Sequence, residues 1–295
     1  MENIATCPVC ESISFTEEIK CKDYLVSKQD FSVCQCKSCG FKFTNPRPMA
    51  KDLGQYYESD EYISHSNTQK SMLDKIYQVV RKYTISKKVN LINSLSKKGN
   101  ILDIGCGTGE FLNACKQNGW QVTGIEPGNK ARTFAIKQYS LQVGEESDLT
   151  TLTKNSFDVI TLWHVLEHVP NLNERIKEIK SLLKKDGVLL IAVPNAAAWD
   201  AQHYKQHWAA YDVPRHLYHF SPTTIQKLFA MHQFLLSQQL PMKFDSFYVS
   251  LLSEKYMHGT SNYIAAFIKG LRSNINAMST GNYSSLIYVF RNIEI

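Results

Sequence analysis

The segment ILDIGCGTGEF, residues 101–111, places an apolar run directly before three closely spaced glycines. The apolar run predicts a buried strand, and the residues that follow it predict a helix over Glu110–Asn118. Glycine at positions Gly105, Gly107 and Gly109 lets the backbone turn tightly and lets a ligand approach the main chain, because no Cβ stands in the way. The first amides of the helix have no partner inside that helix. The segment therefore predicts a strand, a ligand-binding turn and a helix.

The spacing of these glycines differs from the fingerprint of dinucleotide-binding folds. The pattern G-x-G-x-x-G would need a glycine where Glu110 stands. A nucleoside ligand without a pyrophosphate is therefore favoured. Glu126 ends the next expected strand, in GIEP, 21 residues after Gly105. A carboxylate at that place can accept hydrogen bonds from both hydroxyls of a ribose.

Strands and helices alternate along the chain after Gly99. Short turns between such elements predict a parallel sheet with helices on both faces. Further toward the C-terminus, SPTTIQKLFAMHQF predicts a helix that Ser221 opens, with Pro222 in its first turn. FDSFYVSLL and SSLIYVFR predict two late strands with a partly helical excursion between them, around Glu254–Gly281. Before the glycine turn, apolar residues recur at helical spacing from Thr68 to Ser96 and predict one or two amphipathic helices.

Residues 101–195 resemble the class I S-adenosyl-L-methionine (SAM)-dependent methyltransferases. ILDIGCGTG matches their first motif, GIEP matches the second, and FDVITLWHVLEHV matches the fourth strand and the start of the helix after it. The resemblance implies an α/β fold with a Rossmann-like sheet of seven strands, the last of them antiparallel, and SAM as cofactor. In this reading the three glycines face the methionine part and the sugar of SAM. Asp103 contacts the amino end through water or backbone, and Glu126 holds the ribose.

Six more residues take roles that the resemblance implies. The neighbour of the adenine is expected in GEESDL, where Glu145 and Asp148 are both candidates. Trp163 and His164, at the end of the fourth strand, are expected to flank the methionine moiety. The pair Glu167–His168 falls at the start of a helix, where capping or packing is the expected use.

Two C-x-x-C pairs near the N-terminus predict a metal site. Cys7 and Cys10 form one pair, Cys36 and Cys39 form the other, and 25 residues separate the pairs. Two such pairs can complete a tetrahedral zinc site of four sulfurs, which leaves no position for water and is therefore structural. Cys34 competes with Cys36 as the third ligand, although only Cys36 keeps the two-residue gap. Disulfide pairing is the weaker alternative in a reducing compartment.

The cysteine-bearing segment resembles the zinc ribbons that precede two kinds of methyltransferase. One kind is the sugar C-methyltransferases of deoxysugar pathways, and the other is the ribosomal RNA guanine methyltransferases. CKSCGFKFTNPRP, followed by YYESDEYISH, is closer to the first kind. The expected organisation is a zinc-ribbon module over 1–48, helical linker segments over 49–98 and a methyltransferase domain over 99–295, with a substrate lid at 196–220.

The lid contains WAAYDVPRHLYHF, residues Trp208–Phe220, which is rich in aromatic and titratable side chains. It follows the fifth expected strand, and ligands of doubly wound sheets bind at the carboxyl ends of the strands. His216 is the first candidate for a general base, because an imidazole titrates near neutral pH. Arg215 is a candidate for holding a phosphate or carboxylate, and Tyr211 and His219 are second choices. The alternative is that the lid packs its own aromatics, with the arginine paired to an aspartate and the histidines structural.

Composition limits the partners of the chain. Its 295 residues carry a net charge of +6 without any run of Lys or Arg longer than a pair, which argues against nucleic acid. No apolar stretch reaches the ~20 residues of a membrane span, and the N-terminus has no signal-peptide pattern. We therefore expect a cytoplasmic methyltransferase that acts on a small molecule, such as a sugar or nucleotide-linked sugar, without membrane contact. The alternatives are an RNA methyltransferase that reads RNA through the zinc ribbon, and a non-catalytic SAM-binding module. The acceptor atom and the oligomeric state stay open.

Overall fold

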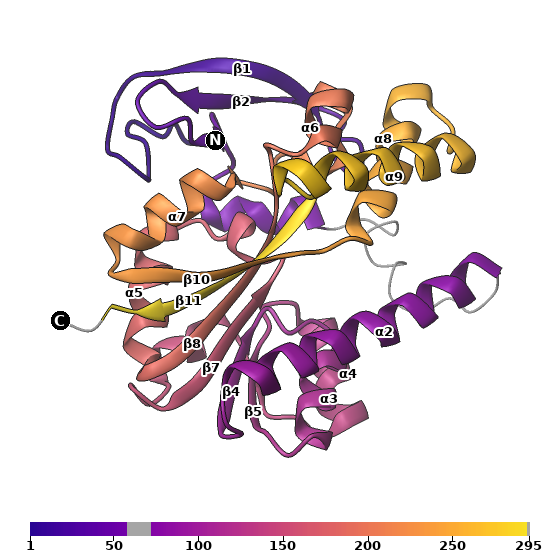
Figure 1. Ribbon diagram of the computed structural model, residues 1–295. Coiled ribbons are helices and arrows are strands. Elements are labelled where there is room, and N and C mark those ends of the chain that lie inside the picture. The colour runs from indigo at the N-terminus through magenta and orange to yellow at the C-terminus, as the bar shows by residue number, and fades with distance from the viewer. Residues whose placement is uncertain (58–71, 294–295) are drawn as a thin grey trace.

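The computed structural model describes residues 1–57 and 72–293, so most of the YYESDEYISH segment and the first residues of the Thr68–Ser96 prediction lie outside it. A seven-stranded sheet forms the centre of the molecule, in the order β10-β11-β8-β7-β4-β5-β6 (Figure 1). Strands β4 to β8 pair in parallel, whereas β11 runs antiparallel to both of its neighbours. The expected sheet with an antiparallel last strand is confirmed. Its strands are β4 (Asn100–Ile104), β5 (Gln121–Ile125), β6 (Val143–Gly144), β7 (Phe157–Trp163), β8 (Leu183–Pro194), β10 (Phe234–Pro241) and β11 (Ser285–Asn292).

Helices cover both faces of this sheet, because its strands are apolar on both sides. In β4, for example, Ile101 packs on one face, and Leu102 and Ile104 pack on the other. Helices α2, α3 and α4 share the face of Ile101, and α5 and α7 share the opposite face (Figure 1). The five helices are α2 (Met72–Leu95), α3 (Glu110–Gln117), α4 (Asn129–Tyr139), α5 (Leu172–Leu182) and α7 (Pro222–Met231).

Helices α2 and α7 correspond to two helices predicted from the sequence. The recurring apolar residues before the glycine turn form the single helix α2, which buries Val89 and Ile92 against the sheet. Helix α7 begins where the sequence predicted. The Ser221 hydroxyl accepts a hydrogen bond from the amide of Thr224 at 3.3 Å, and Pro222 occupies the first turn. Such a cap satisfies an amide that would otherwise lack a partner.

The strand prediction for FDSFYVSLL is wrong, because these residues lie mostly in helix α8 (Asp245–His258). Helix α8 buries Val249, Ser250 and Ser253, a helical rather than an alternating spacing. A second helix, α9 (Tyr263–Thr280), packs against it. The neighbour of β11 is instead β10, directly after α7. A short apolar run does not distinguish a strand from a helix by periodicity alone.

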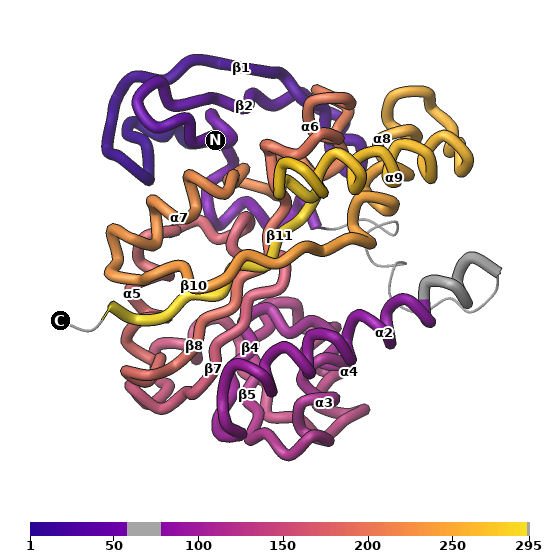
Figure 2. The backbone as a smooth tube through the Cα atoms, viewed as in Figure 1, coloured from indigo at the N-terminus to yellow at the C-terminus, as the bar shows by residue number. Residues whose placement is uncertain are grey.

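A second, four-stranded sheet joins the N-terminal segment to the lid. Its order is β1-β2-β3-β9, and every pair is antiparallel. The first three strands come from the expected zinc-ribbon module, whereas β9 comes from the lid. Helix α6 (Trp199–Tyr204) begins the lid beside this sheet (Figure 2). The strands are β1 (Phe15–Lys22), β2 (Asp30–Cys36), β3 (Lys42–Thr44) and β9 (Tyr218–His219).

Among the described residues, none of the helices combines the length and the apolar character that crossing a membrane requires.

Candidate active site

Glycine stands at the three positions of the turn after β4 for different structural reasons. A Cβ on Gly105 would lie 2.4 Å from Val165, and a Cβ on Gly109 would lie 2.7 Å from Leu141, so both positions need glycine for packing. Both also have positive φ, at +73° and +81°. Gly107 has φ +55°, but a Cβ there would meet no atom within 4 Å. The middle glycine therefore faces open space among the described residues, which is where a ligand can approach the backbone.

Glu126 lies directly beside this open glycine. The pairing of β4 with β5 brings the end of β5 next to the turn, and the amide of Gly105 donates to Ile125 at 2.7 Å. The Glu126 carboxylate accepts hydrogen bonds from the amides of Gly107 and Gly128, each at 2.8 Å. Burial raises the pKa of Glu126, and these two amides act against that rise. A carboxylate offers about four acceptor positions, so two remain for the hydroxyls of a ligand.

Asp103 lies inside the sheet beneath the glycine turn. Its side chain is 2% exposed and accepts a hydrogen bond from the Thr161 hydroxyl at 2.6 Å. Burial raises the pKa of Asp103 to about 7, although the hydrogen bond from Thr161 opposes this. A group at this depth reaches a ligand only through an intervening water or the backbone. That geometry agrees with the indirect contact expected for Asp103, which stays a prediction.

Trp163, at the end of β7, is held between two side chains from the helices of one face. The ammonium of Lys88 on α2 lies 4.1 Å from the centroid of its ring, and Phe111 packs edge-on at 5.4 Å. The indole N–H is buried and has no hydrogen-bond partner in the described part of the chain. The sequence analysis missed Lys88. Its signal is a lysine on the apolar face of α2, three residues after Ile85 and four before Ile92.

Glu145 and Asp148 shape the loop after β6. The carboxylate of Asp148 accepts from the amide of Glu145 at 2.9 Å, and the side chain of Glu145 accepts in return from the backbone of Asp148. This reciprocal pair begins the short helix η2 (Glu146–Thr151). Both side chains are exposed. The assignment of Glu145 to the adenine remains a prediction.

His164 is an ionised histidine at the end of β7. Its two ring nitrogens lie 3.1 Å from the Asp245 carboxylate and 3.5 Å from that of Glu167. Its φ of +57° is uncommon for a residue other than glycine. Burial opposes the charge, but the two carboxylates outweigh it and raise the pKa of His164 to about 9. His164 is therefore a cation at neutral pH, and its ion pair with Asp245 connects the end of β7 to α8.

Glu167 is a buried carboxylate beside two histidines. It is 0% exposed, and neither oxygen has a hydrogen-bond partner among the described residues. Glu167 lies on η3 (Leu166–His168), and ligand atoms of Glu167, His168 and His216 lie within 4.8 Å of one another. The sequence analysis assigned Glu167 and His168 to capping or packing. The structure instead brings both to the first-choice base, His216. The sequence feature that could have indicated this cluster is the close spacing of two histidines and a glutamate in HVLEHV.

Both histidines of this cluster turn Nδ1 to a backbone carbonyl, and for His168 this is the carbonyl oxygen of Arg215 at 3.1 Å. His216 Nδ1 lies 2.8 Å from the carbonyl oxygen of Ala210. Because a carbonyl only accepts, Nδ1 carries a proton and Nε2 of the neutral ring has a free lone pair. The His168 ring lies edge-on to His216, with centroids 4.5 Å apart. Burial, and then the repulsion that a protonated His216 would exert, lower the pKa of His168 to about 4. His168 is therefore neutral at physiological pH.

The structure gives Arg215 a different role from the expected contact with a phosphate or carboxylate. Arg215 is 1% exposed, and its guanidinium donates to Asp212 at 2.7 Å, to Asp23 at 3.0 Å and to the carbonyl of Tyr56 at 3.0 Å. All three partners are protein groups in the interior. The structure therefore favours the alternative, in which Arg215 pairs with Asp212, and its contact with Asp23 connects the lid to the N-terminal segment.

Tyr211 and His219 pack at the same junction. Their rings meet edge-on at 5.1 Å, and His219 Nε2 lies 3.2 Å from the hydroxyl of Thr44 on β3. Both side chains are buried, and burial raises the pKa of Tyr211 and lowers that of His219 well below its ordinary value. Their surroundings favour a packing role over the expected second-choice catalytic role. Of the four catalytic candidates, His216 is the one that belongs to the cluster around Glu167.

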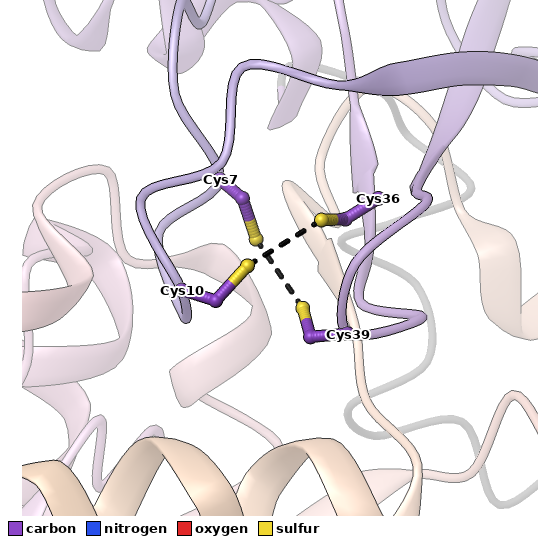
Figure 3. A group of neighbouring side chains, drawn as sticks. All are labelled: Cys7, Cys10, Cys36 and Cys39. Atoms are coloured by element: carbon purple, nitrogen blue, oxygen red, sulfur yellow. Dashed lines mark hydrogen bonds between the residues drawn. The ribbon is translucent and has the colours of Figure 1, made fainter.

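The four cysteines predicted to bind zinc converge on one point, as Figure 3 shows. The Sγ atoms of Cys7 and Cys39 lie 3.5 Å apart, as do those of Cys10 and Cys36, and all four lie within 4.8 Å of one another. Zinc–sulfur bonds of ~2.3 Å in a tetrahedron place sulfurs roughly 3.8 Å apart, so the arrangement fits a zinc ion. Cys34 stands outside this group, and its thiol lies 3.5 Å from the carbonyl of Asn45.

Comparison with known proteins places these features in a family. Residues 77–239 match the model of a family described as a methyltransferase domain. The chain is 39% identical over 106 residues to a ubiquinone biosynthesis O-methyltransferase of Haemophilus ducreyi, covering 32% of this chain and 45% of that protein. It is 33% identical over 105 residues to the protein of the same name from Coxiella burnetii, covering 34% and 45%. The chain thus spans about half the length of the curated relatives it matches.

Solved structures share the fold at lower identity. Magnesium protoporphyrin IX methyltransferase from Synechocystis was solved with bound S-adenosylhomocysteine (SAH). It superposes with a TM-score of 0.55 at 16% identity, and the match covers 82% of this chain and 100% of that one. Geranyl diphosphate C-methyltransferase from Streptomyces coelicolor gives a TM-score of 0.53 and 16% identity, covering 86% and 92%. These similarities concern the fold.

His164→Gln is expected to remove a pH-dependent part of the stability. The carboxylates of Asp245 and Glu167 raise the pKa of His164 from 6.5 to about 9 against the effect of burial. The stabilisation by the charged ring is therefore complete below pH 6.5 and is lost as the pH rises through about 9. Thermal unfolding of the wild type and the variant at these two pH values measures the effect. The difference in Tm should shrink at the higher pH.

His203→Gln is the matched control, because burial lowers the pKa of His203 and its titration falls below this window. A Tm difference between wild type and His164→Gln that stays constant from pH 6.5 to about 9 would contradict the ionised state of His164.

Proposed function

The chain belongs to the family of methyltransferase domains, and from this we propose that it transfers a methyl group from SAM to a small-molecule acceptor. The observation that carries the proposal is the pairing of an open glycine with a carboxylate. Gly107 leaves room above its Cα, and the Glu126 carboxylate is fixed beside it by two amides. This is the arrangement that a nucleoside needs, since the backbone accommodates its body and the carboxylate binds the ribose.

The residues around the turn fit the other parts of the cofactor. Trp163 offers a ring and a buried N–H that has no partner among the described residues, and Lys88 supplies a cation next to that ring. In this proposal Glu126 holds the ribose, Trp163 and His164 flank the methionine part, and Glu145 borders the adenine. SAM, when bound, supplies a methyl group that is already electrophilic. The main task of the protein is then to hold the acceptor in line with that methyl group.

His216 is the proposed general base. Its protonated Nδ1 is anchored on the carbonyl of Ala210, which leaves Nε2 free to take a proton from the acceptor. Glu167, which is buried nearby and also pairs with His164 at 3.5 Å, stabilises the His216 ring once it becomes charged. A base is useful when the acceptor is a hydroxyl or an acidic carbon. We therefore propose O- or C-methylation rather than methylation of a neutral amine.

A sugar or nucleotide-linked sugar is the proposed acceptor class. The support is the sequence pattern of the four-cysteine module, CKSCGFKFTNPRP, from which we infer a resemblance to the zinc ribbons of sugar C-methyltransferases. The name of the curated relatives, ubiquinone biosynthesis O-methyltransferase, independently supports a small molecule with a reactive hydroxyl. Nucleic acid is disfavoured, because the net charge of +6 is spread over the chain without a basic run.

The test begins with a thermal-shift screen of the purified chain with SAH and a panel of nucleotide sugars. One compound is expected to raise the Tm beyond SAH alone. With that acceptor, His216→Ala should lower the rate of methyl transfer by roughly 10²–10⁴-fold, the usual effect of removing a general base. The affinity for SAH should stay unchanged.

His203→Ala, on α6, is the matched control and should retain the wild-type rate. Wild-type turnover in His216→Ala would remove the base assignment. If SAH itself leaves the Tm unchanged, the proposed methyl donor is wrong.

We also propose that Cys7, Cys10, Cys36 and Cys39 hold a structural zinc ion. The support is the convergence of four thiols at spacings that fit a tetrahedron. With four sulfur ligands no position remains for water, so the ion stabilises the N-terminal sheet and takes no part in the reaction.

Cys36→Ser is expected to reduce the zinc content of the purified chain and to lower its Tm, because a serine hydroxyl is a poor zinc ligand. Cys34→Ser is the matched control, since Cys34 lies two residues away and outside the cluster. Elemental analysis of both variants and of the wild type gives the answer. Equal zinc contents in Cys36→Ser and the wild type would contradict the ligand set.

A further inference from the structure

Helix α9 has its large apolar side chains on the outside. The residues that it buries against the rest of the molecule are small: Ala266, Gly270, Ser273 and Ala277. Its large apolar residues are exposed instead, with Ile264 at 76% and Met278 at 78%. We call these seven side chains the α9 apolar face: Tyr263, Ile264, Phe267, Ile268, Leu271, Ile275 and Met278.

This arrangement is the reverse of the pattern expected for a surface helix. A helix on a globular protein normally turns its large apolar residues to the core and its polar residues to water. The α9 apolar face repeats at three- and four-residue intervals along all 18 residues of the helix, so it forms one continuous stripe. None of the residues that the structure describes covers this stripe. An exposed apolar stripe of this size marks an interaction surface.

The packing of α9 keeps this face outward. A Cβ on Gly270 would lie 2.8 Å from the ring of Phe247 on α8, so the two helices touch at the glycine. Phe247 also stacks on Phe267, with centroids 5.4 Å apart. Figure 1 shows α8 and α9 at the edge of the molecule, next to α6. Close packing on the small residues of the inner side fixes the orientation of the outer side.

The charges beside the face are positive. Arg272 is a helical neighbour of both Ile268 and Ile275, and its guanidinium lies 4.9 Å from the ring centroid of Trp199 on α6. At the other edge, the side chain of Asn274 donates to the backbone carbonyl of Lys243, whose own side chain is exposed. Exposed basic residues therefore border the face on both sides.

The acidic residues of this region are engaged elsewhere. Asp245 and Glu254 are the only acidic residues of the sequence between positions 242 and 284. Asp245 pairs with His164, and buried Glu254 accepts from the hydroxyl of Tyr204. A second copy of the chain would bring like charges together at this face. A negatively charged surface complements it.

We propose that the α9 apolar face binds the surface of a lipid bilayer that contains anionic headgroups. Helix α9, about 27 Å long by its 18 residues, lies in the plane of the membrane with the apolar stripe among the acyl chains and Lys243 and Arg272 at the headgroups. An amphipathic helix of this kind lies on a bilayer and does not cross it, in agreement with the lack of a membrane-spanning helix in the described chain. The proposal revises the expectation of no membrane contact and gives the Glu254–Gly281 insertion a role. The proposed membrane binding does not depend on which reaction the protein catalyses.

The test is flotation of the full chain with lipid vesicles in a density gradient. One set of vesicles is phosphatidylcholine, and the other is phosphatidylcholine mixed with phosphatidylglycerol. The wild type should float with the mixed vesicles, and less so at high salt, because the charge contribution is screened. The variant I264Q/I275Q/M278Q should bind at least about tenfold more weakly, since it loses three of the seven apolar side chains, among them the two most exposed. The variant K243Q/R272Q should lose its preference for the anionic vesicles.

The variant I13Q/L235Q is the matched control, because Ile13 and Leu235 are exposed apolar residues outside α9. It should float like the wild type. All variants should keep the wild-type Tm, because the substituted side chains are exposed.

Equal flotation of I264Q/I275Q/M278Q and the wild type would overturn the proposal. So would a lipid-free dimer of the wild type in analytical ultracentrifugation that this variant abolishes, combined with no flotation. That result would assign the face to a second copy of the chain.

Discussion

The carboxylate of Glu126, held between the amides of Gly107 and Gly128, is the contact on which the candidate cofactor site depends. It exists because β5 pairs in parallel with β4, so that the two strands end side by side. The pairing in turn needs small residues: a Cβ on Gly124 of β5 would lie 2.8 Å from the thiol of Cys106 in the glycine turn. The position of the Glu126 carboxylate therefore depends on both the conformation of the glycine turn and the register of β4 with β5. Any nucleoside placed over Gly107 meets Glu126.

A second constraint, the buried charge network of Arg215, organises the acceptor side. Arg215 connects Asp212 in the lid to Asp23 in the N-terminal segment. The contact with Asp23 is fully buried, and the contact with Asp212 is mostly buried. Breaking such a network by removing one partner typically costs about 3–5 kcal/mol, because the other charges stay buried. The next residue along the chain is His216, which lies against Glu167 and His168. The cysteine module and the lid therefore share a sheet and an ion network, and together they hold the proposed base at the end of β7. The sugar-type acceptor stays a proposal until a compound is found.

The fold was predictable where the sequence signal is local. The glycine turn, the strand–helix alternation and the Ser221 cap each depend on neighbouring residues, and the structure contains all three. FDSFYVSLL failed because a short apolar run fits a strand or a helix equally well. For Arg215 the sequence left two uses open, a ligand contact or a pair with Asp212 three residues away, and the structure contains that pair. Its second partner, Asp23, could not be predicted because it is far away in the chain. The outward apolar face of α9 was hidden because periodicity does not say which side a helix buries.

The central claim, that Glu126 grips the sugar of a SAM-type nucleoside, is tested most directly by isothermal titration of SAH. The wild type is compared with Glu126→Gln and with the control Glu174→Gln, an exposed carboxylate on α5. Hydrogen bonds to a charged group are worth about 1.5–3 kcal/mol, so Glu126→Gln should raise the Kd roughly ten- to a hundredfold. The control should bind like the wild type. A Kd of Glu126→Gln equal to that of the wild type, or no binding of SAH by the wild type, would contradict the account.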